Sequence, residues 1–329
     1  VPANATYVSG QNLDFTVNFS ENVTVVDAGG TPQLAITVGS TARQAAYQSG
    51  TGTGSLLFRY TVQSGDLDTN GIAVGSLSAN GGTLKDAATN DANLTLNSVG
   101  ATASVLVDAV SPAITSVSST KADGSYGLGE TIAITVTFDE AVTVTGTPQL
   151  ELETGAVDRN VDYSLGTGTN TLTFNYTVQM GDESADLDYK ATNALTLNGG
   201  TIKDAAGNDA TLTLAAPAAA NSLGNNKALV VEAFPTVTLS VGSASIAEAS
   251  GTSTVTATLS AISSQDVTVN LAYSGTATSG IDYNNTASTS IIVPAGSLSA
   301  NAAVGITATQ DVNPETNETI IIDITGVTK

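Results

Sequence analysis

Apolar and polar residues alternate along many short stretches of the chain. At positions 56–62 every second residue is apolar, and positions 172–178 repeat the same arrangement. This period of two is typical of a β-strand with one buried face, because successive side chains point to opposite faces of a sheet. Clusters of Gly, Asn, Asp and Pro interrupt these runs roughly every 8–12 residues, as they do in antiparallel β-sandwiches. The pattern therefore predicts an all-β chain with almost no helix.

The first two thirds of the chain contain two copies of one sequence. The segment "LLFRYTVQSGD" ending at Asp66 corresponds to "LTFNYTVQMGD" ending at Asp182, and "NGGTLKDAATNDANLTL" corresponds to "NGGTIKDAAGNDATLTL". From about Phe234 the pattern changes. We therefore predict three tandem antiparallel β-sandwich domains of Ig-like shape, in residues 1–109, 110–232 and 233–329. Both connections are short and carry an acid before a proline, so we expect an elongated row rather than flexibly linked domains.

Two strands of these sandwiches lack a counterpart in the sequence. The second domain begins with "AITSV" before Lys121, whereas almost nothing equivalent precedes "VPANATY". Nothing after Lys329 supplies a last strand for the third domain. We expect the first domain to lack its first strand and the third domain its last.

The charge of the chain argues against several classes of function. Its 30 Asp and Glu residues against 9 Lys and Arg give a net charge of −21, so it has no basic surface for nucleic-acid phosphates. It contains no Cys and no His, which excludes disulfides, zinc sites built from these residues, and Ser–His or Cys–His catalysis. Hard cations bound by oxygen ligands remain compatible with the composition. No run of 18 apolar residues predicts a membrane span.

Enzymatic readings have little support. Paired carboxylates can hydrolyse glycosides, but the chain has no Trp and only 5% aromatic residues, which leaves little material for a sugar-stacking cleft. We predict a protein that is not an enzyme.

Several motifs resemble known families. The pieces "GTPQL", "YTVQxGD" and "GGTxKDAAxN" and the terminal "VDA" before a proline resemble the bacterial Ig-like repeats of large RTX-type and biofilm adhesins. The third segment, with "IAEASGT", "GTATSGIDY" and "PETNETIIIDI", resembles the Calx-β domain. The resemblance implies a secreted or cell-surface adhesin segment, and the Calx-β fold often binds calcium.

The loop "GDLDTNGI" is the first candidate calcium site. Asp66, Asp68 and Asn70 stand at alternate positions before a glycine, and the carbonyl of Ile72 can point inward, as at the start of a D-x-D-x-N-G calcium loop. The alternative is that this Asx-Gly sequence simply makes a turn.

The corresponding loop of the second repeat reads "GDESADLDYKATN". Its acids Asp182, Asp186 and Asp188 repel one another unless a cation or solvent separates them, which favours a second calcium site. The alternative is a solvated acidic loop.

Topology predicts a third site. In an antiparallel sandwich the loop after the second strand lies beside the incoming linker, which places Asp139 and Glu140 near Asp108. A cation that bridges the linker and the loop would fix the interdomain angle. The alternative is that these surface acids never meet.

The Calx-β resemblance implies a fourth site. Three connections of such a sandwich lie at one pole, and in this sequence they carry the acids that match calcium ligands of the family: Glu248, Asp282, Asp311, Glu315 and Glu318. Gln310 and Val312 stand where further Asp residues often occur, so we expect at most one ion there. The alternative is that these acids make structural hydrogen bonds.

Together these observations predict a non-enzymatic, calcium-stabilised extender or display segment of a bacterial adhesin. Its expected partners are Ca²⁺ and the neighbouring domains of the same long chain, with no nucleic acid and no membrane span, and we expect a monomer that is secreted or on the cell surface. The alternative function is a module that recognises a glycan or protein on a target cell.

Overall fold

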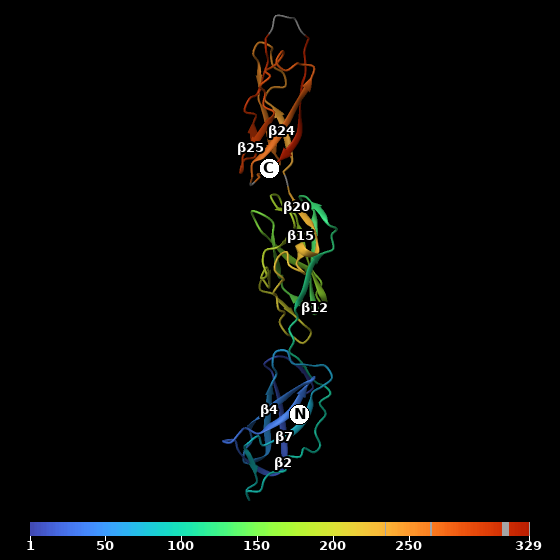
Figure 1. Ribbon diagram of the computed structural model, residues 1–329, viewed down its shortest axis with the longest axis vertical. Coiled ribbons are helices and arrows are strands. Elements are labelled where there is room, and N and C mark those ends of the chain that lie inside the picture. The colour runs from blue at the N-terminus through green and yellow to red at the C-terminus, as the bar shows by residue number, and fades with distance from the viewer. Residues whose placement is uncertain (234, 264, 311–315, 329) are drawn as a thin grey trace.

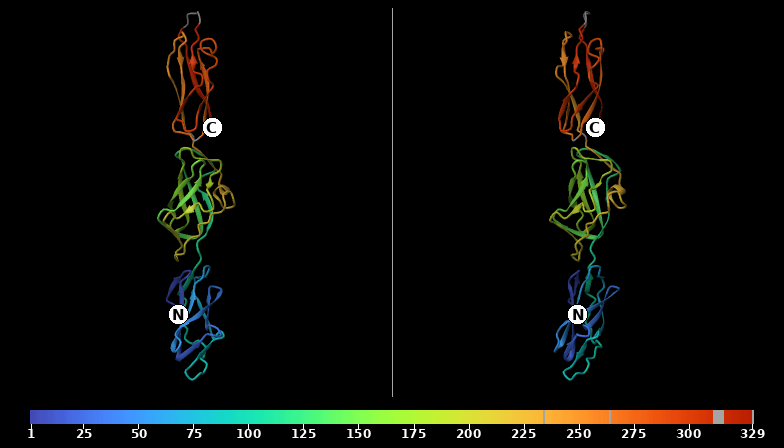
Figure 2. Two further views of the ribbon diagram at one scale, coloured as in Figure 1. Left: turned by 90° about the vertical axis from the view of Figure 1, so that its left-hand side faces the viewer. Right: turned by 60° about the vertical axis from the view of Figure 1, so that its left-hand side comes forward.

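The computed structural model describes residues 1–233, 235–263, 265–310 and 316–328. It forms three units in a row, joined by narrow connections (Figures 1 and 2). Three separate clusters of buried apolar side chains underlie these units, and they extend from Leu13 to Ala109, from Val117 to Ala233 and from Val255 to Ile306. No sheet crosses from one cluster to the next within the described residues. We call the three bodies the first, second and third units.

The first unit is a sandwich of two sheets. One sheet has the strand order β7-β3-β4-β5-β2-β8, and the other has the order β1-β9-β6. The strands are β1 (Ala5–Tyr7), β2 (Asn12–Val26), β3 (Gln33–Val38), β4 (Thr41–Ser49), β5 (Thr53–Thr61), β6 (Leu67–Asp68), β7 (Ala73–Ser78), β8 (Thr83–Lys85) and β9 (Val105–Asp108).

The second unit repeats this plan with two more strands in its larger sheet, one of them β10 at the edge. Its larger sheet has the order β10-β12-β15-β14-β13-β17, with β18 also on β13 and β19 also on β12, and its smaller sheet has the order β11-β20-β16. The elements are β10 (Ile114–Ser119), β11 (Gly124–Tyr126), β12 (Thr131–Thr145), β13 (Gln149–Glu153), β14 (Arg159–Leu165), β15 (Thr169–Thr177), β16 (Glu183–Ser184), β17 (Asp188–Tyr189), β18 (Leu195–Thr196), β19 (Thr201–Lys203), α1 (Leu223–Asn226) and β20 (Leu229–Glu232).

The third unit has three smaller sheets, with the orders β21-β23-β26, β22-β27 and β25-β24-β28. Its strands are β21 (Val237–Val241), β22 (Thr252–Ser253), β23 (Val255–Leu259), β24 (Val267–Gly275), β25 (Ser290–Val293), β26 (Ser299–Asn301), β27 (Ile306–Thr307) and β28 (Ile320–Thr328).

The predicted all-β fold class is confirmed. In β5 the alternate residues Leu56, Phe58 and Tyr60 are buried between partly or fully exposed neighbours, as the period of two predicts. The pairing differs in one respect: β1 pairs with β9, and β11 with β20, in parallel rather than antiparallel register. In the first and second units the two paired strands are far apart in the sequence, so no hairpin constrains their direction.

Candidate functional site at the first interdomain junction

A loop of the second unit holds the linker that leaves the first unit. The last residue of β9 is Asp108, and its backbone carbonyl accepts a hydrogen bond of 2.9 Å from the side-chain amide of Asn208. The same amide donates to the carboxylate of Asp204 at 2.7 Å. That carboxylate is buried and also accepts the backbone N–H groups of Gly207 and Asn208, at 2.6 and 2.8 Å. These bonds fix the amide in the direction of the linker.

The rest of the linker is bound to β12 and to a later segment. The carboxylate of Asp139 accepts the N–H of Ala113 at 2.8 Å, and the N–H of Asp139 donates to the carbonyl of Ala113 at 2.9 Å. The N–H of Thr211 donates to the carbonyl of Pro112 at 2.8 Å. These three bonds define the path of the chain between the two units.

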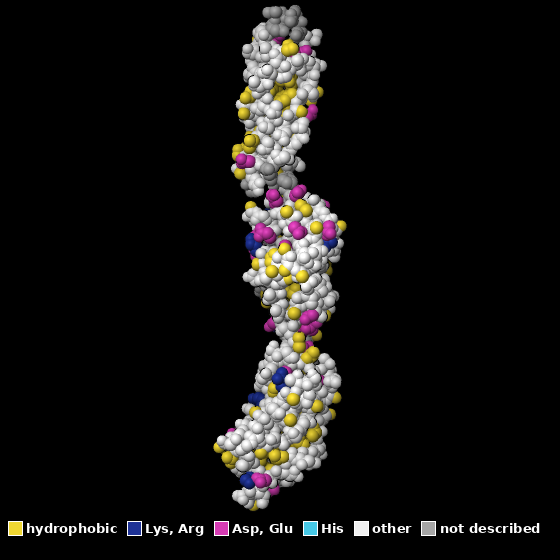
Figure 3. All heavy atoms as spheres, in the orientation of Figure 1, with side chains coloured by type: hydrophobic (Ala, Val, Ile, Leu, Met, Phe, Trp, Pro, Cys, Tyr) yellow, Lys and Arg dark blue, Asp and Glu magenta, His cyan; other side chains and the backbone are white. Residues whose placement is uncertain are grey.

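Acidic side chains surround this linker. Burial raises the pKa of Glu140, and the negative charges of Asp204, Asp108 and Asp139 raise it further. Carboxylates from the end of β9, from β12 and from the loop after β19 therefore lie within electrostatic reach of Glu140. Figure 3 shows Asp and Glu side chains at this narrow junction, with few Lys or Arg on the same face.

Topological reasoning placed Asp139 and Glu140 beside Asp108, and the structure brings these three residues together. Topological reasoning did not identify Asp204 and Asn208. Both residues belong to the repeated motif "GGTIKDAAGN", which matches "GGTLKDAATN" of the first repeat. In the first unit Asp86 and Asn90 make the same bonds within their loop, at 2.8 and 2.7 Å.

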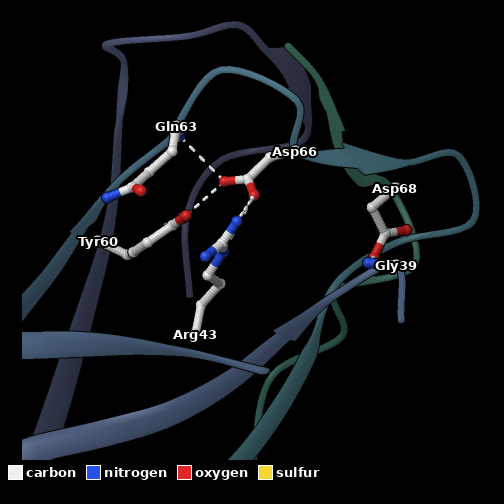
Figure 4. A network of polar contacts seen from close by, with 6 residues as sticks. All are labelled: Gly39, Arg43, Tyr60, Gln63, Asp66 and Asp68. Atoms are coloured by element: carbon white, nitrogen blue, oxygen red, sulfur yellow. Dashed lines mark hydrogen bonds and ion pairs between the residues drawn. The ribbon is translucent and has the colours of Figure 1, made fainter. Parts of the chain in front are cut away.

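Asp66 lies in a different environment from the one predicted (Figure 4). The residue is 3% exposed. Its carboxylate accepts two hydrogen bonds from Arg43, at 2.6 and 3.0 Å, one from the N–H of Gln63 at 3.0 Å, and one from the hydroxyl of Tyr60. Burial by itself would raise the pKa of Asp66, but the hydrogen bonds from Tyr60, Gln63 and Arg43 outweigh it and lower that pKa.

Asp68 and the carbonyl of Ile72, which belong to the same predicted calcium loop, also have protein partners. Asp68 accepts the N–H groups of Gly39, Gly71 and Asn70, at 2.6, 2.7 and 3.2 Å, while the carbonyl of Ile72 accepts the hydroxyl of Thr102. In Figure 4 the carboxylates of Asp66 and Asp68 point to different partners. Protein donors thus contact the carboxylates of Asp66 and Asp68 and the carbonyl of Ile72, and the Asx-Gly turn forms; the assignment of calcium to this loop stays a prediction.

The second repeat contains the same buried network. Asp182 is completely buried and accepts hydrogen bonds from Arg159 at 2.7 Å, from the hydroxyl of Tyr176 at 2.5 Å and from the N–H of Gln179 at 2.8 Å. Asp182 is therefore engaged in this network, and its assignment to a calcium site stays a prediction.

Asp186 and Asp188 approach each other at the start of α1. A Cβ placed on Gly224 would lie 3.5 Å from a carboxylate oxygen of Asp186 and 3.0 Å from one of Asp188. Asp188 also accepts the N–H groups of Tyr189 and Ala218, each at 2.9 Å. The acids of the second predicted calcium site are thus divided. Asp186 and Asp188 lie near each other, whereas Asp182 belongs to the buried network with Arg159.

The acids of the third unit are only partly described. Asp282 accepts the N–H of Thr278 at 2.6 Å, while Glu248 and Glu318 are exposed. Asp311 and Glu315 lie outside the described residues. Across the part of the chain that the structure describes, no three Asp or Glu carboxylates converge closely enough to form a ready-made metal site.

Comparison with protein families gives a match for the second unit. Residues 108–220 match the bacterial Ig-like domain. The match covers roughly a third of the chain and includes the junction residues from Asp108 to Asn208. Bacterial Ig-like domains are usually extracellular or at the cell surface, and the fold is typically non-enzymatic. The match suggests a surface-associated extender or adhesion-type module.

Other comparisons are much weaker. A marsupial T cell receptor shares 9% identity over 98% of this chain and 97% of its own, with a TM-score of 0.32. Native E. coli alpha-2-macroglobulin shares 9% identity over 94% of this chain and 20% of its own, with a TM-score of 0.17. Neither likeness carries an argument. No curated protein matches the chain. Among the described residues no helix is long and apolar enough to cross a membrane.

Proposed function

We propose that this chain is a non-enzymatic extender of a secreted or cell-surface bacterial adhesin, which holds neighbouring parts of the adhesin at a fixed separation. The bond from Asn208 to the carbonyl of Asp108 carries this proposal, because it ties a loop inside the second unit to the last residue of β9 in the first. Domains that share few contacts usually move relative to one another. A linker bound at Asp108, Pro112 and Ala113 restricts that motion.

We further propose that Ca²⁺ stiffens this junction. The candidate ligands are Asp108, Asp139 and Glu140, and the negative charge of Asp204 acts on Glu140 as well. The environment of Glu140 supports this role, because burial and three neighbouring acids oppose its ionisation, and a divalent cation would reverse that repulsion. Carboxylate and carbonyl oxygens are the ligands that Ca²⁺ prefers, and water molecules commonly complete its shell.

Calcium titration tests the calcium part of this proposal. Extracellular modules bind Ca²⁺ with dissociation constants of ~10⁻⁴–10⁻³ M, so at ten times that constant one site adds ~1.4 kcal/mol to stability. The melting temperature of the second unit should then be higher with Ca²⁺ than with chelator, and the difference should disappear in Glu140→Gln. Equal melting temperatures for the unsubstituted chain in both buffers would refute the calcium proposal and leave the extender proposal to be judged on interdomain rigidity.

A further inference from the structure

Any pull between the first and third units reaches the second unit through its two terminal segments. The chain enters this unit from the linker 108–113 and leaves it after Ala233, at the opposite end of the unit (Figures 1 and 2). The entering segment carries β10 and then β11, and the leaving segment is β20. A pull from the neighbouring units is therefore applied to β11 from its first residue and to β20 from its last.

The strands β11 and β20 pair in parallel, with Gly124 opposite Leu229 and Tyr126 opposite Val231. The N–H of Gly124 also donates to the carbonyl of Ala228 at 3.0 Å. Because the strands run in the same direction, a pull on the start of one and the end of the other slides them past each other. The evenly spaced bonds of a parallel pair then stretch together. Strands pulled apart from one shared end would instead lose their bonds one at a time.

The buried network of Asp182 holds the other side of β20. The strand β16 pairs antiparallel with β20. Directly beyond this pair, the N–H of Ala233 donates to the backbone carbonyl of Asp182 at 3.0 Å. The carboxylate of the same Asp182 accepts hydrogen bonds from Arg159 in β14 and from Tyr176 in β15. The residue at which the chain leaves the unit is thus connected, through one buried aspartate, to two strands of the larger sheet.

The first unit repeats both features. Its β1 pairs in parallel with β9. The residue after β9 is Ala109, and its N–H donates to the backbone carbonyl of Asp66 at 2.8 Å. The carboxylate of Asp66 accepts hydrogen bonds from Arg43 and Tyr60. Parallel terminal strands and an aspartate that anchors the exit therefore belong to the plan of the repeat.

We propose that each of these two units is a force clamp, in which the parallel terminal strands bear tension along the row and the buried aspartate passes it to the larger sheet. The proposal rests on the extender role, because an extender transmits force between its neighbours. The two are nevertheless separable by experiment. A unit without a clamp can still hold its neighbours at a fixed separation when no load acts, and scattering in solution measures that separation.

Single-molecule pulling on the full chain tests the clamp through the direction of load. Because the chain contains no Cys, handles can be attached at chosen pairs of exposed positions. Ser111→Cys with Thr236→Cys loads the second unit as its neighbours do. Leu128→Cys with Thr236→Cys pulls on the ends of β11 and β20 that lie at one pole, where Gly127 is beside Glu232. The first pair should require a higher unfolding force at the same loading rate, although the same bonds open in both.

A matched pair of substitutions tests the role of the network. Tyr176→Phe removes one hydrogen bond to the carboxylate of Asp182, and Tyr189→Phe removes one to the carbonyl of Ala215; both tyrosines are buried. At a constant load between residues 111 and 236, Tyr176→Phe should unfold about tenfold faster, because a hydrogen bond to an ionised group is lost. Tyr189→Phe should change this rate less than about twofold, because β17 belongs to the other sheet and its bond is still intact when the clamp opens.

Two results would overturn the proposal. The first is an unfolding force for the load between residues 111 and 236 that is equal to, or lower than, the force for the load between residues 128 and 236. The second is an equal change of the unfolding rate in Tyr176→Phe and Tyr189→Phe. Neither result bears on the separation of the units at rest, so the extender proposal is judged independently by scattering.

Discussion

The side-chain amide of Asn208 donates to the backbone carbonyl of Asp108, a residue 100 positions earlier and at the end of the preceding unit. The donor is fixed by the buried carboxylate of Asp204, and the acceptor lies where the chain leaves β9. The loop of the second unit that contains Asp204 and Asn208 thus holds the end of β9, the last strand of the first unit. This relationship makes the junction testable by substitution.

Replacing Asn208 by Ala should loosen the junction. The variant loses the bond to Asp108 and one bond to Asp204, at about 1 kcal/mol for each hydrogen bond. Because the chain has no Cys, spin labels can be attached at Gln44→Cys and Asn160→Cys, both exposed and in different units. The distribution of distances between the labels should broaden in Asn208→Ala.

The matched control is Asn90→Ala. Asn90 makes the corresponding bonds to Asp86, but its loop lies away from this junction. This variant should destabilise the first unit to a similar extent and leave the label distances unchanged. Equal broadening in both variants would show that the linker bond has no special role.

Replacing Asp182 by Asn should strongly destabilise the second unit. The carboxylate is completely buried and pairs with Arg159, so loss of its charge leaves the guanidinium without its partner. Breaking a buried ion pair from one side costs ~3–5 kcal/mol, which should appear as a lower denaturation midpoint by circular dichroism. Asp209→Asn is the control: its ion pair with Lys203 is exposed and contributes at most ~1 kcal/mol. Similar midpoints for the two variants would contradict this account of the network.

Replacing Glu140 by Gln should stabilise the chain at neutral pH without calcium. The folded state raises the pKa of Glu140, so it disfavours the ionised form more than the unfolded state does. The resulting stability is present below the unfolded value of 4.5 and is lost as pH rises through the folded pKa. A comparison of melting temperatures at pH 4 and pH 7 in chelator should therefore show the gain of Glu140→Gln only at pH 7. A gain of equal size at both values would exclude an electrostatic origin.

The buried tyrosine of the first network should make the first unit sensitive to alkali. The pKa of Tyr60 is raised from 10.0 to about 12. Burial of the phenol is the largest cause, and its hydrogen bond to Asp66 is the second. The stabilisation is complete below pH 10 and is lost as pH rises toward 12, because the unfolded chain releases the phenolic proton more readily. In Tyr60→Phe the stability of the first unit, measured by circular dichroism, should decrease less steeply as pH rises from 10 toward 12. An unchanged slope would show that this phenol does not govern the alkaline limit.

The strand pattern was predictable because alternation of apolar residues is a local property. Leu56, Phe58 and Tyr60 show it without any knowledge of their partners. The position of Asp139 and Glu140 beside Asp108 followed from strand topology alone, since the order of strands in a sandwich decides which loops share a pole.

The buried networks were harder to predict because their members come from three segments. An Arg stands 23 residues before the Asp in both repeats, as Arg43 before Asp66 and Arg159 before Asp182. That equal spacing, which the sequence analysis did not use, is the signal that indicates an ion pair. The acids at alternate positions of "GDLDTNGI" gave the opposite indication, because local spacing contains no information on a distant guanidinium.

Small-angle X-ray scattering of the chain in calcium-containing buffer tests the central claim most directly, because it reports whether the first two units keep one orientation. The account predicts a curve that a single elongated arrangement of the units reproduces, with the linker 108–113 held as in Figure 1. A curve that requires a mixture of straight arrangements and arrangements bent at residues 108–113 would contradict it.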